Sequence, residues 1–168
     1  MATQNLLQRL DKAADTTGSS INASNRRIEE TFIVAETTGI ASGDFVTLDL
    51  NQSDDSDKAL YVKKLTVTPI SSLGIGVALE AGAEGAAIRI CIRGICSANC
   101  DNSVVQSDRL IGSSTAGRAV VATEYRSDQK EGDGGAGVGA VTQQEHIVAW
   151  AVGGASGNVA KVYVLPNF

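Results

Sequence analysis

The sequence predicts an all-β fold, a small β-barrel or sandwich made of two similar half-units, with an extended N-terminal arm that carries a short helix. From Thr31 onward, short apolar runs rich in Val, Ile and Thr recur, and Gly, Asn, Asp and Ser separate them. No segment after residue 30 has a helical period. Aromatic residues make up only 4% of the 168 residues, so Val, Ile, Leu and Ala must build the core. Short strands in this number and at this spacing are typical of a sandwich or a barrel.

The N-terminal segment differs in pattern from the β domain, which we place at residues 31–168. Three leucines lie at helical spacing near its start, and a polar stretch without a period follows them. An isolated N-terminal segment is often a disordered tail. The leucines favour instead an arm that docks on a partner, because a solvated tail has no use for them. The candidate contact residues of this arm, residues 1–30, are Leu6, Leu7, Leu10, Arg26 and Arg27.

The β domain contains two related stretches. The segment GIGVALEAGAEGAAIRICIRG, which begins at Gly74, aligns with IVAWAVGGASGNVAKVYVLP, which begins at Ile147, with one gap in the turn. Upstream of them, GIASGDFV resembles SVVQSDRL, and Asp44 then matches Asp108. Each half-unit has a turn, a strand and a hairpin, and since neither can bury its apolar face alone, we expect the two to pack together. The predicted halves span about 37–95 and 101–168.

Alternation along two predicted strands places charged side chains on one face. In the run from Ile88 to Arg93, the isoleucines share one face, and the arginines share the other with Cys91. Near the C-terminus, Lys161 and Tyr163 lie on the face opposite the valines. Ordinary outward-facing charge on a sheet explains this pattern as well as an interface does. As a candidate interface face for acidic groups of a protein partner, we take Arg89, Arg93, Lys161 and Tyr163.

Three cysteines and the single histidine are the candidate zinc ligands: Cys91, Cys96, Cys100 and His146. A Cys3His site would require all four to converge, yet Cys91 lies in mid-strand and no paired CxxC knuckle occurs. A domain of this size can fold without a structural metal. We therefore expect free thiols, no metal and no other cofactor. No GxSxG elbow accompanies His146, so we also expect no enzymatic activity.

Two segments match the beginnings of ligand-binding motifs without their structural context. Residues 132–137 (GDGGAG) fit GxGxxG, but a charged loop precedes them and a β-like run follows, where a dinucleotide site needs a strand and then a helix. The segment from Asp49 starts like an EF-hand loop, but Asp54 replaces the required Gly and Leu60 replaces the terminal Glu. Both segments are predicted to be exposed loops.

Charge and hydropathy argue against two classes of partner. The net charge is -5, and Lys and Arg form no cluster that could replace the counterions of a nucleic acid. No apolar run reaches the roughly 18 residues needed to span a bilayer. No secretory signal is visible at the N-terminus, so we expect synthesis in a cytoplasm and a soluble product. Neither a nucleic acid nor a membrane is an expected partner.

The motifs of the first half-unit resemble those of the capsid decoration, or cement, proteins of tailed bacteriophages. These proteins carry an SGD turn before a strand, here Ser42-Gly43-Asp44. An IGVALE hairpin with small residues and a glycine then leads into an alternating strand, here Ile75 to Glu80, Gly85 and Ile88 to Gly94. The second half-unit follows the same pattern more loosely, and the resemblance covers about residues 37–168.

The resemblance implies a non-enzymatic virion protein, made in the host cytoplasm and located on the outer surface of the capsid. Members of the family bind the expanded head, commonly as trimers at local threefold sites, and cement neighbouring capsid subunits. The implied partners are the major capsid protein and further copies of this chain, as a homotrimer. The arm would then lie across a neighbouring capsid subunit or add a strand to an exposed sheet edge.

Three other functions are compatible with the sequence. A tail or fibre β-module that binds host glycans would present aromatic side chains in exposed loops, and the two long polar loops contain none. A small zinc-dependent or hydrolytic enzyme would need the cysteines and the histidine to converge. A small ligand-binding β-barrel is compatible with the same composition. Head decoration is the function that the motifs favour.

Overall fold

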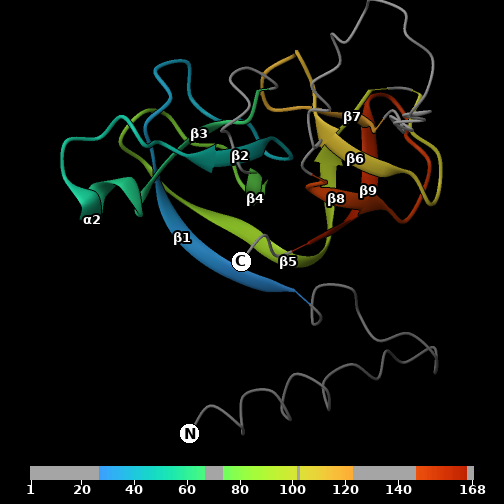
Figure 1. The fold of residues 1–168 in the computed structure, drawn as a ribbon, viewed down its shortest axis with the longest axis horizontal. Coiled ribbons are helices and arrows are strands. Elements are labelled where there is room, and N and C mark those ends of the chain that lie inside the picture. The colour runs from blue at the N-terminus through green and yellow to red at the C-terminus, as the bar shows by residue number, and fades with distance from the viewer. Residues whose placement is uncertain (1–26, 67–73, 102, 123–146, 166–168) are drawn as a thin grey trace, which may run out of the picture.

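The computed structural model describes residues 27–66, 74–101, 103–122 and 147–165 (Figure 1). Within these ranges the chain forms nine strands and one helix of four residues, so the predicted all-β class is confirmed. None of the helical residues described forms a span that is long and apolar enough to cross a membrane. The elements are β1 (Ile28–Val34), β2 (Phe45–Leu48), α2 (Asp55–Lys58), β3 (Tyr61–Lys64), β4 (Gly74–Ala78), β5 (Ala87–Asn99), β6 (Arg109–Gly112), β7 (Ala119–Val121), β8 (Ala149–Ala151) and β9 (Val159–Val164).

The first five strands form a closed barrel, which we call the first unit. Their order is β1-β3-β2-β4-β5, and β1 also pairs with β5, which closes the sheet on itself. The pair of β1 and β3 is parallel, whereas the other pairs are antiparallel. Closure leaves this sheet without a free edge, so every strand finds hydrogen-bond partners on both sides.

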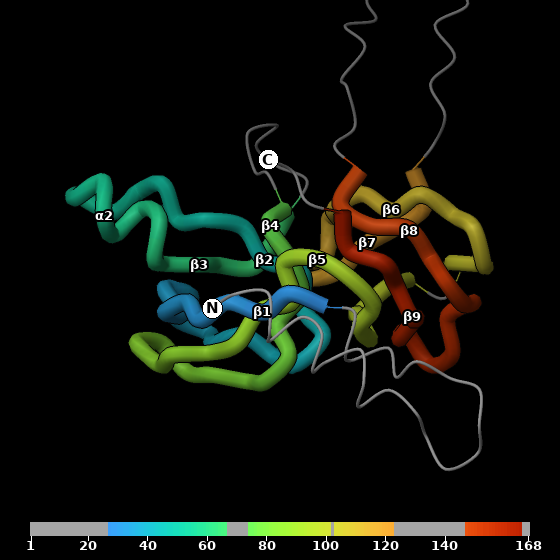
Figure 2. The backbone as a smooth tube through the Cα atoms, turned by 90° about the horizontal axis from the view of Figure 1, so that it is seen from below, coloured from blue at the N-terminus to red at the C-terminus, as the bar shows by residue number. Residues whose placement is uncertain are grey.

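The remaining strands form the second unit, which repeats this arrangement (Figures 1 and 2). Its order is β7-β6-β8-β9-β5, so each strand has a counterpart in the first unit. The long strand β5 belongs to both units, because its first half pairs with β4 and its second half with β9. A glycine, Gly94, lies between the halves with a φ of 110°, a conformation that side chains rarely adopt. A parallel bridge between Cys100 and Ala119 links the ends of the second sheet, as β1 and β3 are linked in the first.

The two units also share their strand register. Ala78 lies opposite Ile90 in the first unit, and Ala151 lies opposite Val162 in the second. The turns before β2 and β6 are built alike. The Asp44 carboxylate accepts a hydrogen bond from the Ala41 N–H at 2.9 Å, and the Asp108 carboxylate accepts one from the Val105 N–H at 2.7 Å. The half-units recognised in the sequence therefore correspond to two units with the same topology.

Each unit has its own apolar interior, and the second is built from smaller side chains. Phe32 and Ile88 face each other across β1 and β5, whereas Ala98 and Ala160 occupy the equivalent pair in the second unit. One buried cluster fills the first barrel, and a second cluster fills the other unit and the contact between the two. In that contact, Leu65 packs so closely that a side chain on Gly112 would touch it.

The connection between the second and third strands of each unit differs in length. In the second unit, residues 113–118 make a tight turn from β6 to β7. In the first unit, residues 49–60 make a longer loop that contains α2. Figure 2 shows that this loop projects at the end of the first unit that is remote from β6–β9.

Candidate functional site

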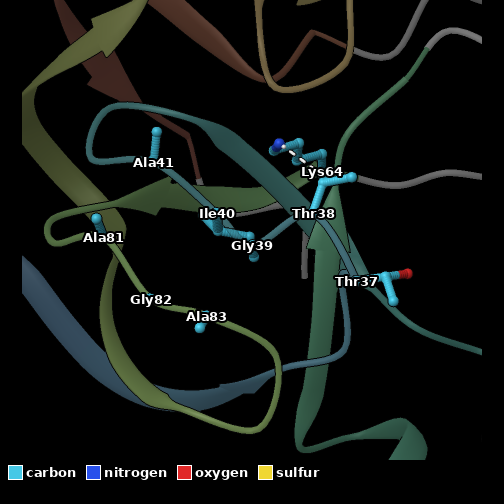
Figure 3. Close-up of a pocket in the computed structure, with 9 residues that line it drawn as sticks. All are labelled: Thr37, Thr38, Gly39, Ile40, Ala41, Lys64, Ala81, Gly82 and Ala83. Carbon is cyan, nitrogen blue, oxygen red and sulfur yellow. Dashed lines mark hydrogen bonds between the residues drawn. The ribbon is translucent and has the colours of Figure 1, made fainter.

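The turn before β2 and the hairpin between β4 and β5 meet beside Lys64, around an open pocket of about 490 Å³ (Figure 3). Ile40 and Gly82 exchange backbone hydrogen bonds of 2.8 and 2.9 Å and so join the turn before β2 to the β4–β5 hairpin. Gly39 has a φ of 72°, and a side chain there would collide with the Gly82 carbonyl. Lys64 reaches into the pocket and donates a hydrogen bond of 3.3 Å to the Thr38 hydroxyl. Backbone and small side chains form the rest of its lining, so the pocket offers shape but no acid–base pair.

One candidate contact residue of the arm, Arg27, and one residue of the candidate interface face, Arg89, form ion pairs within the first unit. Arg27 pairs with Glu29, and the Arg89 guanidinium lies 3.1 Å from Glu29 and 3.4 Å from Glu80. The Arg89 backbone N–H also donates to Glu80 at 2.8 Å, and this bond, helped by the guanidinium, lowers the pKa of Glu80. The hydrogen bond with Glu80 raises the pKa of Arg89 in turn. These positive charges are thus neutralised locally.

The four residues of the candidate interface face belong to different units. Arg89 and Arg93 lie on the first half of β5, and both are exposed. Lys161 and Tyr163 lie on β9 in the second unit, opposite Ser97 and Ile95 respectively. Lys161 is exposed and Tyr163 is half-buried. The set is therefore divided between the two units, which share β5.

The three cysteines are free thiols and all are buried. Cys91 was expected on an outward face with two arginines, but the second unit covers it, because that face of β5 forms the contact between the units. The hydrogen bond with Cys91, together with burial, raises the pKa of Cys96. Burial raises the pKa of Cys100 to about 11. Among the described residues, no three His, Cys, Asp or Glu side chains are grouped as metal ligands would be.

The loop that begins at Asp49 uses its first carboxylate internally. Asp49 accepts hydrogen bonds from the Asn51 N–H at 3.3 Å and the Gln52 amide at 2.8 Å, and it lies 3.2 Å from the Lys63 ammonium. Burial raises the pKa of Asp49, but the bonds from Gln52 and Lys63 outweigh this effect and lower it overall. The carboxylate therefore organises the loop around itself. The loop is a salt-bridged turn around Asp49, in agreement with the sequence, which lacks the residues of a calcium loop.

A row of side chains crosses the outer face of the second unit, and sequence reasoning named only Tyr163 among its members. Arg109, Trp150, Tyr163 and Ile95 lie opposite one another on β6, β8, β9 and β5, so they share one face. Trp150, the only tryptophan of the chain, is 46% exposed. An aromatic row of this kind on a sheet surface is typical of a binding surface. The sequence did contain a signal of this row, because the alignment of the two half-units places Trp150 where the first has the smaller apolar Val77.

Several predicted residues lie outside the described part of the chain. They are the arm residues Leu6, Leu7, Leu10 and Arg26, the histidine His146, and the glycine-rich segment 132–137. Their roles stay predictions.

No protein-family model matches this chain, and no curated protein matches its sequence. Among solved structures, the N base of the head fiber gp8.5 in bacteriophage phi29 has a similar fold, with a TM-score of 0.50. The two sequences are 12% identical, and the match covers 83% of this chain and 95% of the phage chain. At this identity the likeness shows a shared fold, and it spans both units.

Proposed function

We propose that this chain is a structural, non-enzymatic protein of a tailed-phage virion, which binds the outside of the expanded head and cements neighbouring capsid subunits. The observation that carries the proposal is the two-unit β fold, which is similar to that of a phage head fiber base along 95% of that chain. The resemblance of the SGD turn and the IGVALE hairpin to cement proteins points to the same part of the virion. These are two separate kinds of likeness, one in structure and one in motif.

The physical logic of a cement protein suits this chain. A protein that binds only the expanded lattice stabilises that lattice by mass action. Contacts with several capsid subunits at once add through multivalency, so each contact can be modest. A homotrimer has the symmetry of a local threefold site, and the major capsid protein is then its partner. The net charge of -5 suits an outer surface that does not meet the packaged DNA.

A fibre base is the second candidate. The similar phage structure favours it, because that structure is the N base of a head fiber. In this case the chain would also sit on the head, but it would connect a further appendage to the capsid. The two candidates share capsid binding and differ in whether a second protein binds on top.

The test is co-sedimentation of the full chain with heads of the phage that encodes it. We expect saturable binding to expanded heads at about one chain per capsid subunit. We expect no binding to unexpanded shells, which serve as the control. Binding at far lower copy number, together with a bound fibre protein, would favour the fibre base. No binding to expanded heads at any concentration would contradict both candidates.

A further inference from the structure

The two units are not equally covered, although they are built alike. In the first unit, Phe45, Val77 and Cys91 form a row across β2, β4 and β5, and each is at most 1% exposed. They are buried because the second unit packs on this row and joins them in one apolar cluster. The fold therefore uses this face of a unit to hold another unit.

The equivalent row of the second unit has no such cover among the described residues. Register places Arg109 where the first unit has Phe45, Trp150 where it has Val77, and Tyr163 where it has Cys91. Trp150 and Arg109 are exposed and Tyr163 is half-buried. Lys161 lies two residues before Tyr163 on the same face and is exposed. We call these residues, with Ile95, the outer row.

The tight turn of the second unit contacts the first unit at one end of its row. The Phe45 N–H donates a hydrogen bond of 2.8 Å to the carbonyl of Gly117, and Gly117 also lies against the Asp44 carboxylate. Gly117 belongs to the turn between β6 and β7, so this turn contacts the first unit beside Phe45, at one end of the row. The counterpart in the first unit is the longer loop between β2 and β3, and we call its residues 50–60 the α2 loop.

The α2 loop is chemically complementary to the outer row. It carries Asp54, Asp55 and Asp57, of which Asp55 pairs with Lys58 at 2.8 Å, whereas the outer row carries the exposed Lys161. It also exposes two leucines, Leu50 at 59% and Leu60 at 40%. Acidic groups beside apolar ones thus match a basic group beside aromatic ones. Figure 2 shows the loop at the end of the first unit remote from the second, where another molecule can reach it.

We propose that the outer row of the second unit binds the α2 loop of a second copy of this chain. On the second unit, the contact uses the face whose equivalent in the first unit is buried between the two units of the chain. It is heterologous, because two different surfaces meet, so successive copies form a closed ring or an open chain. This contact would join the subunits of the homotrimer in the proposed function. It rests on the proposed function only for the number of copies. A ring of three copies would place six units in sequence.

Sedimentation of the full chain over a dilution series, read together with the fluorescence of its single tryptophan, tests the contact. We expect the mean mass to rise with concentration and the Trp150 emission to shift to shorter wavelength in step, because association covers that side chain. A chain that stays monomeric with a solvent-exposed tryptophan at every concentration would overturn the proposal. So would a tryptophan that is shielded in the monomer at every dilution, because the chain's own residues would then cover the row.

Two charge-reversed variants make the test specific. Lys161→Glu reverses the charge of the outer row beside Trp150, and Asp54→Lys/Asp55→Lys/Asp57→Lys reverses the α2 loop. We expect each alone to be monomeric and their equimolar mixture to associate, since each then offers the charge that the other needs. The matched control Glu30→Lys/Glu84→Lys changes exposed carboxylates elsewhere and should associate like the original chain. Association that neither reversal weakens would overturn the proposal.

Capsid binding by the same variants separates this inference from the proposed function. Binding of the monomeric variants to expanded heads would leave the proposed function intact. Failure of the original chain to bind heads while it self-associates as described would count against the proposed function alone.

Discussion

The Asn99 side-chain amide donates a hydrogen bond of 2.8 Å to the Asp44 carboxylate, and this bond joins the two units of the chain. Asp44 lies in the turn before β2 of the first unit, and Asn99 ends the shared strand β5. The other carboxylate oxygen accepts the Ala41 N–H, so both oxygens of a buried carboxylate are satisfied. The equivalent Asp108 keeps the turn hydrogen bond at a half-buried position, where none of the described residues forms a further unit.

The first prediction concerns these equivalent aspartates. We expect Asp44→Ala to lower the free energy of unfolding by about 2–3 kcal/mol, because buried donors lose a charged acceptor. Asp108→Ala, the matched control, should cost only about 1 kcal/mol, since water can replace the lost acceptor at a half-buried turn. Urea unfolding measures both. Equal losses would show that the bond to Asn99 adds nothing to the contact between the units.

The second prediction concerns Gly76 in β4. A side chain there would lie 2.4 Å from the Cys91 carbonyl oxygen, which is backbone and cannot swing away. Gly76→Ala should therefore lower the free energy of unfolding by about 2–3 kcal/mol through overpacking. Gly153→Ala is the control, because nothing lies within 4 Å of a side chain at that position. We expect its effect to stay within about 0.5 kcal/mol, and a comparable loss in both variants would refute the steric explanation.

The third prediction is a pH dependence that arises from Cys100. Burial raises the pKa of this thiol from 9.0 to about 11, so the unfolded chain releases the proton at lower pH than the folded chain. Stability is then complete below about pH 9 and falls as the pH rises toward 11, by up to about 2–3 kcal/mol. Unfolding of the original chain and of Cys100→Ser is compared at pH 8 and pH 10.5, values on either side of the unperturbed pKa of about 9. The difference in stability between the two proteins should shrink at the higher pH, and an unchanged difference would contradict the assigned shift.

The fourth prediction concerns the N-terminal arm. A chain that lacks residues 1–25 keeps Arg27 and all of β1, the strand that closes the first barrel. The truncated chain should therefore keep the near-ultraviolet circular dichroism of the β domain, which contains every aromatic residue of the chain, and unfold like the original. Its binding to expanded heads should be weakened or lost, because Leu6, Leu7 and Leu10 are the proposed anchors. Undiminished binding by a folded truncated chain would show that the arm is not the docking element.

Much of the fold follows from local signals in the sequence. The alternation Ile88, Ile90 and the punctuating glycines predict strands and turns, because side-chain direction along a strand is set by neighbours in sequence. The match of Asp44 with Asp108 predicted two related turns, and both carboxylates make the same hydrogen bond. A turn of this kind depends on four consecutive residues, so its chemistry can be read without the rest of the chain.

What the sequence could not predict depends on contacts between distant segments. The first half-unit was expected to end at about residue 95, but its last strand, β5, runs on to Asn99 because β9 pairs with its second half. Cys91 looks outward by alternation, yet the second unit buries it. The opposite holds for Trp150, which lies in an apolar run typical of a buried strand. It is exposed because nothing in the described second unit covers the face that the first unit has covered.

The most direct test of the central claim is a cryo-electron microscopy reconstruction of expanded heads before and after incubation with the full chain. The account predicts added density on the outer surface, at the local threefold sites, into which the two-unit β structure fits as three copies. Heads whose reconstructions are identical with and without the protein, at a concentration that saturates any sedimented binding, would contradict the account.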